Sequence, residues 1–259
     1  LGDEADSMDE LIHGVRLRQK RGCDAIKLVV TGGQMAPGSG AERTSYTIDK
    51  IQAIQHESRY LGLPTFAHCL TTEGFVNSVL GDVDCIEHVA CFRRHKNQLL
   101  ERVYEPEVME RFRGDKRYFM KGITCFYHNL DPYRSGEKEP TWKEVFWLEQ
   151  ERRMVDIFNK VVDLGLTPVL GTDAGTSHTY FDETSFELEI FVERCGISNK
   201  LAIDIGTVNS AACMGLQAVT GQLSEDFSAD IIALRNNPLE DIRAFRKVDQ
   251  VICQGTLVV

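Results

Sequence analysis

Four polar side chains of types that bind metals or move protons lie at the ends of apolar, strand-like segments. Lys27 lies in DAIKLVVTGG, His68 in LPTFAHC, His88 in DCIEHVA and Asp173 in LTPVLGTDAG. Imidazole and carboxylate groups are common ligands of zinc, and a carboxylate also serves as a general base. A lone histidine in a strand is more often a hydrogen-bonded core residue, so it is the combination of the four that indicates a metal site.

Strand-like segments alternate along the chain with segments of helical periodicity, which predicts parallel βαβ units. Strands are expected at residues 25–31, 63–69, 84–90, 122–130 and 166–175. Helices are expected at residues 7–21, 47–60, 71–81, 106–121, 141–164, 183–195 and 207–216. Because the carboxyl ends of parallel strands meet on one side of a sheet, the polar residues there are expected to share a site.

Side-chain alternation along a strand indicates which residues face that site. Lys27 points away from the bulky Ile26 and Leu28, which are expected to pack under helices. Glu87 has the opposite parity to His88, so we expect it to pair with a helix residue outside the site rather than to bind metal. By the same alternation, we expect the other three candidates to face the same interior as Lys27. They are His68, His88 and Asp173.

Composition narrows the class of partner. The 259-residue chain carries a formal charge of −10, and this acidic balance argues against nucleic acid or an anionic membrane and favours a small-molecule or dipeptide substrate. Eight cysteines without a C-x-x-C pair are expected to be reduced core residues of a cytoplasmic protein. The sequence has no apolar run long enough for a transmembrane helix.

The order and content of these segments resemble the amidohydrolase superfamily, in the branch that holds imidazolonepropionase-related hydrolases and Xaa-Pro dipeptidases or carboxypeptidases. The resemblance covers nearly the whole chain, through DAIKLVVTGG, FAHC, CIEHV, LGTDAG and TVNSAACMGLQAVTGQLSEDFSADIIALRNNPLEDI. It implies an α/β fold of the (β/α)8 TIM-barrel type. Residues 1–222 would form the last five βα units, and residues 223–259 would supply strands to a small composite β-sandwich.

The resemblance also implies a chemistry. Lys27 would be carbamylated by CO2 and would bridge divalent metals, with zinc the best-suited ion and one or two ions bound. His68 and His88 would bind one ion and Asp173 the other. Asp173 would take a proton from the metal-activated water and pass it to the departing amine during amide or peptide hydrolysis. An anionic carbamate held by metal would explain a lysine within an apolar strand.

Three further residues are expected to contact substrate under this interpretation: Tyr127, His128 and Arg134. Arg134 lies in the loop DPYRSGEKEP and could bind a substrate carboxylate, as a dipeptidase or carboxypeptidase requires. The same metal set also serves deaminases and cyclic-amide hydrolases, which differ in their pocket loops. A non-catalytic homologue used for binding or assembly is the alternative outside the enzymes.

The sequence departs from the family around His68, where AHC replaces the commoner HAHG, and at the first barrel strand. Relatives carry an H-x-H pair on the first barrel strand, and no such pair occurs here. The segment with Lys27 would correspond to the fourth strand of the family. We therefore expect a truncated chain or a missing N-terminal segment, with a piece of a split protein or a decayed homologue as alternatives. A homo-oligomer is a further expectation that the sequence leaves open.

Overall fold

The computed structural model describes residues 4–34, 38, 40–96, 99–176 and 178–259. Contacts between Cα atoms divide the chain into two compact units. The first comprises Leu1–Met120 with Asp163–Leu166, and the second comprises Lys121–Val162 with Thr167–Val259.

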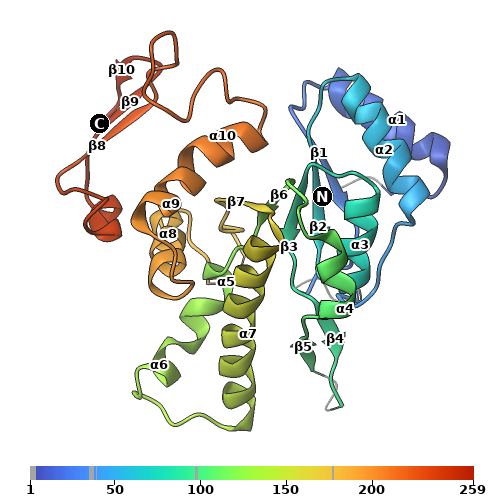
Figure 1. The fold of residues 1–259 in the computed structure, drawn as a ribbon, viewed down its shortest axis with the longest axis horizontal. Coiled ribbons are helices and arrows are strands. Elements are labelled where there is room, and N and C mark those ends of the chain that lie inside the picture. The colour runs from blue at the N-terminus through green and yellow to red at the C-terminus, as the bar shows by residue number, and fades with distance from the viewer. Residues whose placement is uncertain (1–3, 35–37, 39, 97–98, 177) are drawn as a thin grey trace. The chain divides into compact units, whose positions relative to one another are not determined.

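The first unit contains a parallel sheet with helices between its strands (Figure 1). The strands pair in the order β1 (Ile26–Val29), β2 (Thr65–Cys69), β3 (Cys85–His88) and β6 (Tyr118–Met120). The helices are α1 (Met8–Lys20), α2 (Ile48–Tyr60) and α3 (Thr72–Leu80). The predicted βαβ alternation is confirmed for this unit, whereas closure into a (β/α)8 barrel stays a proposal.

Burial along β1 follows the predicted alternation. Ile26 and Leu28 are each 3% exposed and pack into a core with residues of α1 and α2. On the opposite face, the side chain of Lys27 is 48% exposed and Val29 is 53% exposed. The prediction that Lys27 faces away from the helices is therefore confirmed.

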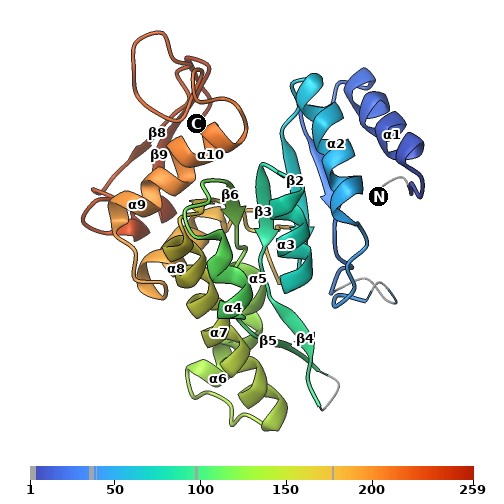
Figure 2. The ribbon, with the colours of Figure 1, turned by 45° about the vertical axis from the view of Figure 1, so that its right-hand side comes forward.

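The ends of these helices follow from local sequence. Ser7 and Glu10 form a reciprocal capping box at the start of α1. At the start of α3 the Thr71 hydroxyl accepts a hydrogen bond of 2.9 Å from the Gly74 N–H, and α3 ends at Gly81 as predicted. Beyond β3, the chain forms an antiparallel hairpin of β4 (Phe92–Arg94) and β5 (Leu100–Arg102), which Figure 2 shows projecting from the end of β3.

The predictions of a helix at residues 106–121 and a strand at residues 122–130 are wrong. Only α4 (Pro106–Met109) and a 3-10 turn (Glu110–Phe112) are helical in the first part, and β6 follows. The expected strand at 122–130 is instead α5 (Thr124–Tyr127) with a 3-10 turn (His128–Leu130). A partner distant in sequence stabilises this helix, because the Glu187 carboxylate accepts hydrogen bonds from the N–H groups of Ile123 and Thr124 at 2.7 and 2.8 Å.

Up to Cys213, the second unit is mostly helical. After α6 (Asp131–Arg134) come α7 (Trp142–Leu164), the short strand β7 (Thr167–Val169), α8 (Thr184–Glu193) and α9 (Asn199–Asp204). A π-helical turn (Ile205–Asn209) leads into α10 (Ser210–Cys213), so the predicted helix at 207–216 begins earlier than expected. The rings of Phe158 and Phe191 stack at 4.9 Å between centroids and join α7 to α8.

The C-terminal residues of this unit form an antiparallel sheet of β8 (Ile231–Leu234), β9 (Val248–Cys253) and β10 (Thr256–Leu257). The predicted β-rich tail is therefore observed, while the domain boundary at residues 222 and 223 and the composite sandwich stay predictions. None of the helices within the described residues has the length and apolar character needed to cross a membrane.

Candidate functional site

An ion pair joins two strands on the face of the first unit's sheet that carries Lys27. The Lys27 ammonium contacts the Glu87 carboxylate, and their side chains are 48% and 11% exposed. Glu87 pairs in register with His68 across β2 and β3. The prediction that Glu87 pairs with a helix residue outside the site is wrong, because residues in register on neighbouring parallel strands lie on the same face.

His68, Glu87 and His88 form a compact cluster of metal-binding side chains. One donor atom from each residue lies within 4.8 Å of the others. The two imidazole rings are edge to face, with 4.8 Å between their centroids and an angle of 72° between their planes. Two nitrogen donors and one oxygen donor are a ligand set that zinc accepts, and three protein ligands leave a position open for water or substrate.

A tight turn explains why two consecutive residues reach the same cluster. The Val89 N–H donates a 2.8 Å hydrogen bond to the Glu87 carbonyl, and His88 between them has a φ of 67°. Strand alternation would send the side chains of Glu87 and His88 to opposite faces. Because of the turn, the His88 side chain lies near His68, as predicted. The reason given for that prediction, side-chain alternation along the strand, is wrong.

The charge on Lys27 decides whether the cluster can accept a cation. With an ammonium at Lys27, the Glu87 carboxylate already has a positive partner. A carbamate at Lys27 would reverse that charge and place two anions side by side, which is unfavourable unless a cation lies between them. The donor set is therefore compatible with the implied carbamate only when metal is bound at the same time.

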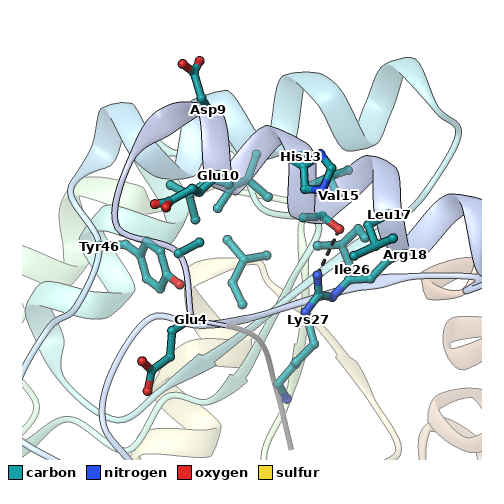
Figure 3. Close-up of a pocket in the computed structure, with 15 residues that line it drawn as sticks. Glu4, Asp9, Glu10, His13, Val15, Leu17, Arg18, Ile26, Lys27 and Tyr46 are labelled. Atoms are coloured by element: carbon teal, nitrogen blue, oxygen red, sulfur yellow. Dashed lines mark hydrogen bonds between the residues drawn. The ribbon is translucent and has the colours of Figure 1, made fainter.

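A pocket of about 510 Å3 lies between α1 and β1. Its apolar lining includes Leu11, Val15 and Leu28, and its charged lining includes Arg18 and Lys27. Figure 3 shows the Lys27 side chain extending away from α1. The pocket therefore lies on the helix side of β1, whereas the Lys27 ammonium reaches the opposite side, where Glu87 lies.

Asp173 belongs to the second unit and lies outside a strand. β7 ends at Val169, so side-chain alternation does not extend to Asp173 as expected. Asp173 is exposed with a φ of 61°, and its carbonyl accepts hydrogen bonds from the N–H and hydroxyl of Thr176. Its role as a metal ligand and proton carrier stays a prediction.

The three expected substrate-binding residues lie together in the second unit. The His128 ring stacks on Phe186 at 5.1 Å, and its Nε2 and Nδ1 atoms lie 2.9 Å from a Glu183 carboxylate oxygen and 3.4 Å from an Asp131 oxygen. The Arg134 guanidinium lies 3.8 Å from the centroid of the Tyr127 ring.

The Arg134 guanidinium also has two carboxylate partners. It donates a 2.6 Å hydrogen bond to Glu151 and pairs with Asp131. Its side chain is only 18% exposed. Binding of a substrate carboxylate by Arg134 stays a prediction, and it would have to compete with these two residues.

Comparison with known proteins shows that the chain is similar to hydrolases. The model of the amidohydrolase family matches residues 5–258. An ochratoxinase from Aspergillus niger is 27% identical over 244 residues, which is 94% of this chain and 47% of the relative. The chain thus spans about half the length of the curated relatives that it matches.

Two solved structures have the same fold over almost the whole chain. A Xaa-Pro dipeptidase with methionine bound in its active site is 25% identical, with a TM-score of 0.78 over 98% of this chain and 59% of that one. The A. niger ochratoxinase structure is 26% identical, with a TM-score of 0.77 over 98% of this chain and 55% of that one.

Proposed function

Because the chain belongs to the amidohydrolase family, we propose that it is a metal-dependent hydrolase of amide or peptide C–N bonds. The observation that supports this proposal most directly is the cluster of His68, Glu87 and His88 beside Lys27. The chain spans about half the length of its relatives. We therefore propose this activity for the whole protein to which the site belongs.

In this proposal His68, Glu87 and His88 hold one divalent cation, and a carbamate on Lys27 completes the site. A cation held there would lower the pKa of water and polarise the substrate carbonyl. The Asp173 carboxylate would accept the proton released from water and deliver it to the nitrogen of the departing amine. His128 would contact the substrate through its imidazole, and Arg134 would keep Tyr127 in place beneath its guanidinium.

The substrate class follows from the relatives only as a proposal. The names of the matched proteins refer to Xaa-Pro dipeptides and to ochratoxin. We propose a dipeptide or a related acyl amino acid, and we propose the cytoplasm as the compartment. Parallel assays with a Xaa-Pro dipeptide and a cyclic amide would distinguish a dipeptidase from the cyclic-amide hydrolases that share the metal set.

The first test is a lysine-to-arginine substitution. Lys27→Arg keeps a cation beside Glu87 but cannot form the carbamate. With zinc and 13C-bicarbonate, the wild-type chain is expected to give a carbamate 13C resonance that chelator removes, and Lys27→Arg is expected to lack it. Zinc content, measured by elemental analysis after gel filtration, should fall in the variant.

Lys50→Arg is the matched control, because Lys50 lies in α2 and donates to the Asp6 carbonyl at the surface. Its carbamate signal and zinc content should equal those of the wild type. Equal zinc content in Lys27→Arg and wild type would remove Lys27 from the proposed site. A wild-type chain that retains no zinc would overturn the proposed function itself.

A further inference from the structure

The segment that follows β3 has an unusual backbone. His88, Val89 and Cys91 have φ values of 67°, 43° and 51°, in the left-handed region that glycine adopts easily and other residues avoid. A β-branched residue such as valine is a particularly rare occupant of this region. None of the three positions is a glycine, so the rest of the structure must impose this conformation on them.

The turn at His88 belongs to a strained class. A hydrogen bond from residue i+2 back to residue i, around a central residue with φ near +75°, defines the γ-turn that is rare in proteins. Here the Val89 N–H donates to the Glu87 carbonyl across His88. This turn allows the neighbouring side chains of Glu87 and His88 to meet His68 in one cluster.

The chain is buried from the last residue of the turn onward. Val89 is completely buried, Ala90 is 4% exposed and Cys91 is 1% exposed. Backbone hydrogen bonds then anchor the chain, from the Phe92 N–H to the Leu70 carbonyl at 2.7 Å and from the Val103 N–H to the Cys91 carbonyl at 2.9 Å. Val89 is itself the last residue of the turn, and its side chain is fully buried.

We propose that Val89 is a positioning residue for the metal site: its buried isopropyl group imposes the left-handed turn that brings the His88 imidazole to His68 and Glu87. The zinc measurement that tests this inference rests on the proposed function. The claim that Val89 positions His88 can also be tested in the protein without metal. Val89 itself touches neither substrate nor metal in this proposal. It acts through the backbone of His88.

Alanine and glycine at position 89 separate this role from ordinary core packing. Val89→Ala removes the isopropyl anchor but keeps the preference of an L-residue for negative φ, so the turn should relax and His88 should leave the cluster. Val89→Gly removes the anchor too, but it tolerates the φ of 43° at position 89, so the turn should be retained better than in Val89→Ala. A role in packing alone predicts the opposite order, because glycine leaves the larger cavity.

Two measurements test the proposal. Zinc affinity, from chelator competition, is expected to fall about 10-fold or more in Val89→Ala, the scale of losing a group that orients a ligand, and to fall less in Val89→Gly. In metal-free protein with 13C-labelled histidine, the nuclear Overhauser effect between the His68 and His88 rings should weaken in Val89→Ala and persist in Val89→Gly.

Val83→Ala is the matched control, because Val83 is also a buried valine of the first unit, 1% exposed, and it lies outside the turn. It should leave both readouts unchanged. Wild-type behaviour of Val89→Ala, or a larger loss in Val89→Gly than in Val89→Ala, would overturn the proposal. If the wild-type chain binds no zinc, the ring-to-ring signal alone still decides whether Val89 positions His88, while the proposed function fails separately.

Discussion

Replacing His68 with alanine is expected to lower the affinity of the chain for Zn2+ by more than about 100-fold. Loss of a group that merely orients a ligand already costs about 10-fold to 100-fold, and His68 would supply a donor atom directly. Without His68, the proposed site would keep Glu87, His88 and the Lys27 carbamate, which offer one imidazole nitrogen instead of two. Equilibrium competition with a zinc chelator measures this loss.

His56→Ala is the control for this prediction, because His56 is an exposed residue of α2. It removes one imidazole from the chain and should leave zinc affinity unchanged. Circular dichroism should show the same secondary structure in both variants. Wild-type zinc affinity in the His68 variant would mean that the cluster does not bind the metal.

Glu187→Leu is expected to lower the free energy of unfolding by about 3 kcal/mol, because each buried donor left without an acceptor costs about 1 to 3 kcal/mol. The fully buried Glu187 carboxylate accepts hydrogen bonds from two backbone N–H groups, those of Ile123 and Thr124, and from the Thr124 hydroxyl. Leucine fills a similar volume but accepts no hydrogen bond. Urea denaturation monitored by circular dichroism measures the difference.

Glu187→Gln is the matched variant, because its amide oxygen can still accept from one of the two backbone N–H groups, which bond to different oxygens of the Glu187 carboxylate. It also tests the titration of the acid. Burial raises the pKa of Glu187 above its ordinary value of 4.5, and hydrogen bonds from Thr124 and Ile123 oppose that rise. The stability contributed by the protonated acid is therefore complete below pH 4.5 and is lost as the pH rises through the folded-state pKa.

Stability of the wild type should consequently fall relative to Glu187→Gln as the pH increases from 4 toward neutrality, by the linkage between pKa and stability. Glu187→Leu should be less stable than Glu187→Gln at every pH. Equal stability of the leucine and glutamine variants would contradict the capping role of this carboxylate.

Features of the fold that depend on neighbouring residues could be predicted from the sequence. The alternation of Ile26, Lys27 and Leu28 correctly predicted which face of β1 is buried, because one face packs on helices and the other does not. Gly81 correctly marked the end of α3. The family resemblance is likewise confirmed by the match over residues 5–258.

The failures came from interactions between distant segments and from a backbone conformation that residue type does not indicate. Residues 122–130 are rich in β-formers, but their helical start depends on Glu187, which no local pattern includes. Glu87 joins the cluster because β2 and β3 pair in a particular register and because His88 adopts a left-handed turn. Neither feature can be read from side-chain alternation within one strand.

The contact between Glu187 and the start of α5 also constrains the order in which the chain can fold during translation. Glu187 follows Thr124 by 63 residues, so the ribosome releases the α5 segment well before its acceptor has been synthesised. Until then, the amide groups at Ile123 and Thr124 must be hydrated or bound by a chaperone. This segment therefore reaches its native conformation only after α8 has emerged, and the second unit matures late on the nascent polypeptide.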